Sequence, residues 1–388
     1  MIIHYFKVDF TYMSKIIRYF NKLENYCQPS KALVIFGARQ VGKTTLLKHY
    51  LETCGFRYKL DSGDNVLLQV MLQNADFKTI FDYVSDYELI AIDEAQLIPN
   101  IGQCLKIMID QIPNLRVIVT GSSSFELAGQ VGEPLTGRKK TITLFPIAQL
   151  ELNKIFNRSE LHEKLSDYLI YGSYPEVVTA KTIAQKQEYI NEIVQSYLFK
   201  DILTLEKIKN PKTLIDLLKS LAFQVGSEVS TTELARHLMV DVKTIARYLD
   251  LLEKSFIIFN LRGFSRNLRN EITKKSKYFF YDNGIRNALI ANLNSLDLRD
   301  DVGKLWENFL MIERIKKDSY QGKMVNRYFW RTWEQKEIDL IEEHDGKLFA
   351  YEFKWPERTT KAPKDWSDNY PEASFEVIHR QNYLDFIL

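Results

Sequence analysis

The chain has 388 residues, of which 45% are hydrophobic and 26% are charged, as in an ordinary soluble globular protein. A formal net charge of +2 excludes a globally basic protein, so any surface that binds nucleic acid must be a local patch. The length allows two or three domains, each with its own core.

Three features of the sequence concern cellular location. No apolar run approaches the roughly 18 residues that a membrane span requires. The opening MIIHYFKVDF lacks the basic region, apolar core and cleavage site of a signal peptide, and residues 1–12 are expected to be a dispensable extension. Cys27, Cys54 and Cys104 are odd in number and far apart, which indicates a reducing cytoplasm without disulfides or a zinc cluster.

The first predicted elements lead into a glycine-rich loop. Residues 14–26 have the apolar spacing of an amphipathic helix. The apolar run Ala32–Phe36 predicts a buried strand, and Thr44–Leu51 predicts a helix. Between the two lies GARQVGKTT, which fits the P-loop pattern G-x-x-x-x-G-K-[ST].

The P-loop pattern predicts a site for a nucleotide polyphosphate. Its glycines let the backbone fold closely around the anion, so that successive N–H groups and a helix N-terminus point at it. Lys43 would reach the β- and γ-phosphates, and the Thr44 hydroxyl would complete the ligand shell of a Mg²⁺ ion. The predicted nucleotide-binding residues are Gly37, Ala38, Arg39, Gln40, Val41, Gly42, Lys43, Thr44 and Thr45.

The next segments alternate between short apolar strands and helices. Further strands are expected over Tyr58–Leu60, Tyr87–Ile92, Arg116–Thr120 and Lys140–Leu144, with a helix around Val66–Leu72. This alternation predicts an α/β fold with a parallel sheet and helices on both of its faces. Ligands of such folds bind at the carboxyl ends of the strands, where every motif found so far lies.

Acidic and hydroxyl residues at these strand ends complete a candidate hydrolytic site. Asp93 and Glu94 resemble a Walker B motif, in which Asp93 holds Mg²⁺ through water and Glu94 polarises the attacking water. Alternatively, the two acids only cap the next helix. Ser122 is placed to sense the γ-phosphate, or is a simple turn residue. Arg138 is a candidate arginine finger in the same or a neighbouring subunit, or a solvated base.

Five segments in fixed order make a resemblance specific: GARQVGKTTLL, IAIDEAQ, VTGSSS, LTGR with its following strand, and YGSYPEVV. They resemble a large prokaryotic ATPase family, similar to AAA+ proteins, whose C-terminal domain is described only as of unknown function. The resemblance implies an AAA+-like core and ATP rather than GTP. It places functional weight on Gly37–Thr45, Asp93, Glu94, Ser122 and Arg138, but it supplies no cellular role.

The middle of the chain is expected to be helical and then to form a winged helix. Residues 148–221 have helical spacing, interrupted at Pro175 in a YGSYP turn that is expected near the ATP site or an interdomain hinge. Helices over Thr232–Leu238 and Val242–Lys254, followed by a strand, have helix-turn-helix proportions. The alternative is a packing module within the ATPase. The residues expected to face a DNA major groove are Lys243, Thr244, Arg247 and Tyr248. The basic segment beyond is either a contact for the phosphate backbone or a solvated loop, and its residues are Arg262, Phe264, Arg266, Arg269, Lys274, Lys275, Lys277 and Tyr278.

The C-terminal region holds a second candidate site. A helix over Val302–Lys317 carries Glu307, and three strands follow, with Asp339 on the second and Glu352 and Lys354 on the third. Alternation along a strand puts Glu352 and Lys354 on one face. This order resembles the PD-(D/E)XK nuclease fold, although an isoleucine precedes Asp339 where the motif has proline.

The resemblance to this nuclease fold implies metal-dependent hydrolysis. Asp339 and Glu352 are predicted to bind a second divalent metal ion through hard oxygens, with Lys354 positioning water and Glu307 completing the catalytic set. Trp330, Trp333 and Trp355 are candidates for base stacking, or are simply core residues.

Four domains are therefore expected. They are the N-terminal helix with an AAA+-like P-loop NTPase core (1–150), a helical subdomain (151–225), a winged helix (226–262) and a PD-(D/E)XK-like domain (263–388). The favoured hypothesis is a cytoplasmic ATPase that acts on DNA or RNA, with the oligomeric state left open. The rival is a slow ATPase switch that controls a protein partner, with the C-terminal domain as a non-catalytic docking module.

Overall fold

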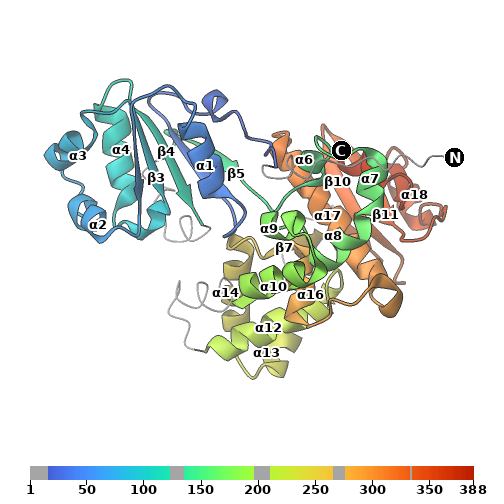
Figure 1. Ribbon diagram of the computed structural model, residues 1–388. Coiled ribbons are helices and arrows are strands. Elements are labelled where there is room, and N and C mark those ends of the chain that lie inside the picture. The colour runs from blue at the N-terminus through green and yellow to red at the C-terminus, as the bar shows by residue number, and fades with distance from the viewer. Residues whose placement is uncertain (1–15, 123–134, 196–209, 265–275, 333) are drawn as a thin grey trace.

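A computed structural model describes residues 16–122, 135–195, 210–264, 276–332 and 334–388 (Figure 1). Two β-sheets organise it, one near each end of the chain. The first sheet is formed by the N-terminal third and lies apart from the second, and the helices α9, α10, α12, α13, α14 and α16 occupy the region below and between them in this view (Figure 1).

The N-terminal sheet is entirely parallel, as the strand and helix alternation predicts. Its strand order is β2-β3-β4-β1-β5. The strands are β1 (Ala32–Phe36), β2 (Tyr58–Ser62), β3 (Leu89–Asp93), β4 (Arg116–Gly121) and β5 (Lys139–Thr143). Because β1, β3 and β4 are neighbours, the residues that follow their carboxyl ends meet at one edge of the sheet.

Helices cover both faces of this sheet. Leu46 and Leu47 of one helix join Leu33 and Ile35 in one buried cluster, and the remaining helices pack in another cluster against the opposite face. The helices are α1 (Lys43–Leu51), α2 (Val66–Leu72), α3 (Phe77–Val84) and α4 (Ile101–Gln111), with short 3-10 turns η2 (Leu23–Asn25) and η3 (Ala95–Leu97). Burial of the strands on both faces explains their continuous apolar sequences.

Helices then dominate up to residue 254. They are α6 (Gln149–Leu152), α7 (Arg158–Glu163), α8 (Leu165–Tyr171), α9 (Pro175–Thr179), α10 (Ile183–Ile193), α12 (Pro211–Phe223), α13 (Thr231–His237) and α14 (Val242–Lys254). Asp241 caps α14 by accepting the Thr244 N–H at 2.8 Å, which explains the sharp start of this helix.

The second sheet has seven strands in the order β12-β11-β10-β9-β7-β8-β6. They are β6 (Glu228–Val229), β7 (Ile258–Gly263), β8 (Ser276–Phe280), β9 (Asn326–Arg331), β10 (Glu337–His344), β11 (Lys347–Phe353) and β12 (Ser374–Ile378). The remaining elements of this region are α16 (Asn283–Leu289), η5 (Leu296–Leu298), α17 (Val302–Tyr320), α18 (Lys364–Asn369) and α19 (Tyr383–Ile387).

This second sheet crosses the domain boundary expected at residue 262. Strand β7 spans that boundary and pairs in parallel with β9, so that Arg262 lies opposite Tyr328. The strands that follow the predicted helix-turn-helix are therefore continuous with those of the C-terminal region. A hydrophobic cluster containing Leu261, Phe279 and Leu340 joins the two parts further.

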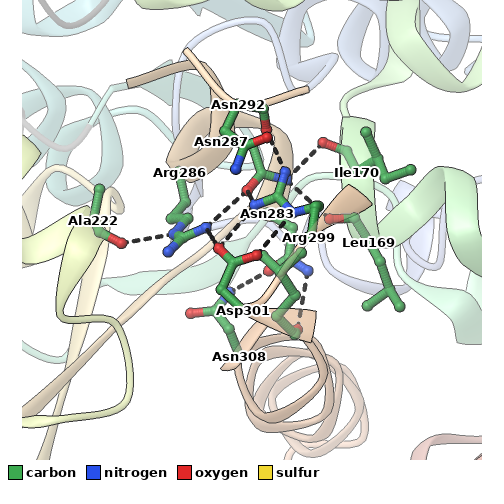
Figure 2. A network of polar contacts seen from close by, with 11 residues as sticks. Leu169, Ile170, Ala222, Asn283, Arg286, Asn287, Asn292, Arg299, Asp301 and Asn308 are labelled. Atoms are coloured by element: carbon green, nitrogen blue, oxygen red, sulfur yellow. Dashed lines mark hydrogen bonds and ion pairs between the residues drawn. The ribbon is translucent and has the colours of Figure 1, made fainter. Parts of the chain in front are cut away.

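A buried polar network fixes the start of α17 against α16 (Figure 2). Asn308 donates to the Asn283 side chain at 2.6 Å, and Asn287 donates to the carbonyls of Leu169 and Ile170 at 3.0 and 2.8 Å. Arg286 donates to the Ala222 carbonyl at 2.7 Å and also pairs with Asp301. The network satisfies groups that would be costly to bury alone, and so it locks these helices together.

The predicted helix over residues 14–26 is wrong where the structure describes it. Residues 16–22 form no helix, and only η2 follows. The Tyr19 N–H is donated to the Glu151 carboxylate at 2.7 Å. A tertiary contact therefore provides the hydrogen bond that this backbone N–H would otherwise make within a helix. Among the described residues, no helix combines the length and apolar character that crossing a membrane requires.

Candidate functional site

The P-loop begins where β1 ends, and its glycines are required by close approach. A Cβ on Gly37 would lie 2.1 Å from the Leu144 carbonyl oxygen, and the Gly37 φ is +150°. Gly42 has a φ of +93° and is the N-cap of α1. These positions explain why only glycine fits this backbone path.

Lys43 is the first predicted catalytic residue that the structure places in this loop. Its side chain is buried, and its Nζ donates to the carbonyl oxygens of Gly37 and Ala38 at 2.9 and 2.8 Å. Burial lowers the pKa of Lys43 to about 8, although Glu94 and Asp93 favour the charged form. Among the described residues, the hydrogen bonds of this ammonium group go to backbone carbonyls of its own loop and not to a carboxylate.

The other loop residues surround this lysine. Val41 is buried, Arg39 is half-buried, and Gln40 and Thr45 are exposed. Gln40 has a left-handed backbone with a φ of +59°. The whole predicted segment thus wraps around the start of α1, with Lys43 at its centre.

Hard oxygen donors for Mg²⁺ meet beside the loop. The Thr44 hydroxyl donates to Asp93 Oδ2 at 2.7 Å, although these residues lie on different elements. Thr120 donates to the other Asp93 oxygen and accepts the Glu94 N–H at 3.1 Å. A hydroxyl and a carboxylate at this spacing fit the chemistry of a magnesium site.

Glu94 lies at the carboxyl end of β3 with a left-handed φ of +48°. The Gln96 amide donates to the Glu94 carboxylate and, at 3.2 Å, to the Ser122 hydroxyl. Gln96, in η3, therefore links residues that follow β3 and β4. The sequence interpretation gave no role to Gln96 or Thr120, although both lie in segments that carry the family resemblance, IAIDEAQ and VTGSSS.

Gly63 is another residue that the sequence interpretation missed. A Cβ at this position would lie 2.2 Å from the Glu94 carbonyl oxygen, and the Gly63 N–H is donated to the Asp93 carbonyl at 2.7 Å. A glycine at the end of β2 therefore lets the loop after β2 approach the acidic motif closely. An isolated glycine after a strand is too common to reveal this role in advance.

Arg138 is the one predicted residue of the nucleotide site that the structure does not bring to the P-loop. It precedes β5, whose first residue Lys139 lies opposite Ala32 at the start of β1. The P-loop follows the other end of β1. Arg138 instead pairs with Asp110 at 2.6 Å, with the arginine side chain 41% exposed. An arginine finger acting within its own chain is therefore excluded by this geometry, whereas action on a neighbouring subunit stays a prediction.

The four predicted residues of the C-terminal site do gather in one place. Glu307 comes from α17, Asp339 from β10, and Glu352 and Lys354 from the end of β11. Lys354 pairs with Glu352 at 2.6 Å, and Asp339 accepts the Phe353 N–H at 2.7 Å. The register of β10 on β9 shifts between Ile338 and Ile341, and such bulges redirect side chains locally.

Two further charged residues belong to this cluster. Lys277 of β8 pairs with Glu337 and lies 3.5 Å from Glu307. The sequence interpretation placed Lys277 in an exposed basic segment, and this was wrong, because the side chain is buried on a strand. Glu337 was missed because it resembles any charged residue at the start of a strand.

The electrostatics of the cluster are dominated by burial and by repulsion between its acids. Burial and the neighbouring Glu307 and Glu352 raise the pKa of Asp339 well above its usual range. Burial alone would lower the pKa of Lys277, but Glu307, Glu337 and Asp339 together raise it. In the described part of the chain, no three His, Cys, Asp or Glu side chains lie close enough together to hold one metal ion.

Comparison with known proteins identifies the N-terminal third. Residues 29–153 match the family model described as an AAA domain. This match agrees with the parallel sheet and the P-loop geometry. Residues 29–153 have the fold of a P-loop ATPase domain. The remaining segments match two domains of unknown function, DUF8612 over residues 162–297 and DUF4143 over residues 302–378.

Several relatives match most of this chain at low sequence identity. Uncharacterized proteins of Haemophilus influenzae and Mycobacterium tuberculosis are each 25% identical, over 84% and 86% of this chain and 83% and 72% of their own lengths. One of Methanocaldococcus jannaschii is 24% identical, over 81% of this chain and 72% of its own. A Walker-type ATPase structure of Pyrococcus abyssi has 16% identity and a TM-score of 0.45, over 69% of this chain and 92% of that chain.

Arg18 connects the ATPase domain with α17. It donates to the Val41 carbonyl in the P-loop, to the Phe145 carbonyl at 2.6 Å and to the Tyr320 hydroxyl at 3.3 Å. Its Nε also pairs with Glu151 at 2.9 Å. One buried guanidinium therefore bridges the nucleotide-binding loop of the ATPase domain and the far end of the helix that carries Glu307.

The YGSYP turn lies at a second junction with the ATPase domain rather than at the nucleotide. The Ser173 N–H is donated to the buried Asp282 at 2.7 Å, and the Ser173 carbonyl accepts the Ile147 N–H at 2.8 Å. A Cβ on Gly172 would lie 2.0 Å from the Asp282 carboxylate. Of the two locations expected for this turn, the structure therefore gives the interdomain one.

Several predicted contacts to nucleic acid are not available in this structure. Tyr248 and Tyr278 are buried, Trp330 packs against Trp366 in the core, and Phe264 packs against Trp366 and Tyr370. The half-buried Trp355 packs against Trp306 and lies beneath Arg380. Thr244 donates to Asp241 at the start of α14. Lys243, Arg247 and Arg262 are exposed, and Arg266, Arg269, Lys274, Lys275 and Trp333 lie outside the described residues.

Proposed function

We propose that the protein binds and hydrolyses ATP with Mg²⁺ at the edge formed by the P-loop and the ends of β3 and β4. The observation that carries this proposal is the meeting of Lys43, Thr44, Asp93 and Glu94 at that edge. Mg²⁺ would neutralise charge on the transferred phosphoryl group, held by Thr44 and, through water, by Asp93.

Residues of the chain itself would bind the phosphates and orient the attacking water. Lys43 exchanges its backbone carbonyl partners for phosphate oxygens, which are better partners for an ammonium. Glu94 orients and polarises the attacking water, and Gln96 keeps the Glu94 carboxylate and the Ser122 hydroxyl in position. Positioning and charge stabilisation account for most catalysis of phosphoryl transfer.

A substitution that separates binding from hydrolysis tests this proposal. Glu94→Gln should bind a fluorescent ATP analogue as tightly as the parent while turnover falls by about a hundredfold or more. Glu88→Gln, at the start of the same strand region and far from the P-loop edge, is the matched control. Equal turnover of Glu94→Gln and the parent would show that Glu94 does not activate water.

We also propose that the C-terminal region acts on nucleic acid through the acid and lysine cluster. Support comes from the meeting of Glu307, Asp339, Glu352 and Lys354, which lie on three different elements. Asp339 and Glu352 are the residues that would hold a divalent ion, whose chemistry would be to activate water for attack on a phosphodiester.

The helix-turn-helix of α13 and α14, with β6, β7 and β8, would form a winged helix beside this cluster. Its exposed Lys243 and Arg247, together with Arg262, would contact backbone phosphates. A gel shift with DNA and RNA at increasing salt tests this part, because phosphate contacts weaken steeply with salt. Binding that is insensitive to salt, or absent, favours the rival, in which the C-terminal region docks a protein partner.

Metal-dependent cleavage tests the second proposal directly. Single- and double-stranded DNA and RNA would be incubated with Mg²⁺ or Mn²⁺, with and without ATP. Cleavage should be lost in both Asp339→Asn and Lys354→Ala and should persist in Lys347→Ala, an exposed lysine at the other end of β11. No cleavage of any substrate would contradict the nuclease hypothesis and leave the ATPase proposal intact.

A further inference from the structure

Arg18 is a buried arginine that belongs to none of the motifs of the nucleotide site. It lies in the segment before β1, which runs from the second region of the structure to the first sheet (Figure 1), and its side chain is 8% exposed. All three nitrogens of its guanidinium donate hydrogen bonds, and the acceptors are Val41, Phe145, Glu151 and Tyr320. One planar group therefore holds several parts of the chain in fixed directions.

The contact with Val41 acts on the phosphate-binding loop. The Val41 carbonyl and the Gly42 N–H belong to one planar trans peptide, so they point in opposite directions. Because Arg18 binds this carbonyl, the Gly42 N–H points away from the guanidinium. It precedes the N–H groups at the start of α1, which have no partner within the helix and are donors for an anion. Arg18 thus orients donors that would meet the phosphates.

The contact with Phe145 acts on the other end of the same loop. Phe145 directly follows Leu144, whose carbonyl oxygen would lie 2.1 Å from a Cβ on Gly37, and whose N–H is donated to the Phe36 carbonyl at 2.7 Å. The Phe145 carbonyl accepts from Arg18 at 2.6 Å. The same guanidinium therefore secures the backbone against which the first glycine of the P-loop packs.

The last contact reaches the end of α17. Tyr320 is the final residue of this helix, and its hydroxyl accepts the N–H groups of Arg18 and Phe145, each at 3.3 Å. The buried Tyr320 ring stacks on Tyr19 with 5.0 Å between centroids and meets the edge of Phe20 at 5.3 Å. The last turn of α17 is thus seated on the residues beside Arg18.

We propose that Arg18 is a positioning residue that holds the P-loop in its phosphate-binding shape and couples nucleotide binding to the last turn of α17. The inference rests on the proposed binding of ATP, and it adds a link from that site to the C-terminal region. Displacing either the Val41 carbonyl or the Tyr320 hydroxyl disturbs the bond to the other, because the guanidinium is rigid. Such coupling is reciprocal, so nucleotide should stabilise the seated end of α17.

Arg18→Lys tests the effect on the loop. Lysine keeps the positive charge beside Glu151 but cannot reproduce the planar fork. The KM for ATP should rise about tenfold, as expected when one hydrogen bond to a charged group is lost, while kcat falls by less than about threefold. Arg299→Lys, at a buried arginine paired with Asp301 (Figure 2), is the matched control. It should lower the melting temperature without changing KM.

Tyr320→Phe tests the link to α17. This substitution removes the hydroxyl that accepts from Arg18 and keeps the packed ring. Amide hydrogen exchange would be measured in the full-length protein, in a peptide covering residues 315–320, with and without the non-hydrolysable ATP analogue AMP-PNP. In the parent the analogue should slow exchange there by about fivefold or more. Tyr320→Phe should lose this protection, whereas Tyr383→Phe, at a buried tyrosine of α19, should keep it.

The outcomes separate this inference from the ATPase proposal. An unchanged KM in Arg18→Lys, or an equal rise in Arg299→Lys, would overturn the positioning role while ATP binding stands. Protection of α17 that persists in Tyr320→Phe would overturn the coupling, and this variant remains informative if Arg18→Lys fails to fold. A well-folded parent that binds no ATP would instead overturn the proposed function and this inference with it.

Discussion

Two buried lysines, Lys43 and Lys277, have opposite surroundings. Both are almost inaccessible to solvent, at 4% and 2% exposure. Lys43 donates to the backbone carbonyls of its own loop, whereas Lys277 contacts carboxylates from other elements. The pKa of Lys43 is accordingly lowered to about 8 by burial, while the acids around Lys277 raise its pKa above the ordinary value.

The difference determines which of the two lysines can still gain a ligand. The carbonyls around Lys43 only partly balance its buried charge, so phosphate oxygens gain by replacing them. The Lys277 ammonium is already paired with carboxylates from two other elements. Lys43 can therefore still gain from an anion, whereas Lys277 already has acidic partners.

The largest expected effect comes from removing the lysine of the nucleotide site. Lys43→Ala should weaken ATP binding and turnover by about a hundredfold or more, because the phosphates lose their buried cation. Lys48→Ala, an exposed lysine on the same helix, should match the parent. Binding of a fluorescent ATP analogue measures the effect. If Lys43→Ala keeps the ATP affinity of the parent, Lys43 does not bind the phosphates.

The second prediction concerns the glycine that lets the loop after β2 reach Glu94. Gly63→Ala should destabilise the fold by about 1–3 kcal/mol and slow ATP turnover, because the added Cβ must push the Glu94 backbone away. Gly303→Ala, where a Cβ meets open space at the start of α17, is the control. Urea unfolding and steady-state hydrolysis report the two effects. An unchanged hydrolysis rate would show that Glu94 tolerates displacement.

A third buried lysine sharpens the comparison. Lys317 donates to the Phe386 carbonyl at 3.1 Å, and burial, with Arg314 nearby, lowers its pKa to about 8. Because the folded-state pKa lies below the ordinary value, this group destabilises the protein below pH 8, and the cost disappears as the pH rises towards the unfolded-state value.

Lys317→Met should therefore raise stability by about 1 kcal/mol at pH 7, after the lost hydrogen bond is subtracted from the relieved burial cost. The advantage over the parent should vanish between pH 8 and pH 10.5, the interval set by these two pKa values. Lys323→Met, an exposed lysine just after α17, should show no such pH dependence. Urea unfolding at several pH values between 7 and 10.5 measures this difference in stability. A stability gain of Lys317→Met that does not vary with pH would argue against titration of Lys317.

The smallest expected effect is at Arg138. Arg138→Ala removes a partly exposed ion pair with Asp110, so stability should change by less than about 1 kcal/mol. Hydrolysis by isolated subunits should be unchanged, because this arginine lies at the opposite edge of the sheet from Lys43. ATP turnover, measured at protein concentrations from nanomolar to micromolar, tests this prediction. A loss that appears only at high concentration would assign Arg138 to the nucleotide site of a neighbouring subunit.

Strands and helices with a clear period were predictable from the sequence. Ala32–Phe36, Val66–Leu72 and Val242–Lys254 have the predicted bounds because their apolar spacing or caps are local properties. The helix expected over residues 14–26 failed for the opposite reason. Its apolar spacing is real, but distant partners such as Glu151 hold the backbone in another conformation.

The sequence by itself determined the P-loop and the residues beside it, because GARQVGKTT is contiguous and parallel strands bring the residues after Asp93 and Thr120 to the same edge. It also identified four members of the C-terminal cluster. Only the tertiary structure decided that Lys277 completes this cluster, that Arg18 joins the P-loop to α17, and that Arg138 lies away from its own nucleotide site. The physical reason is that the sequence around a lysine or arginine does not show whether its charge is solvated or is paired with a buried acid from another element.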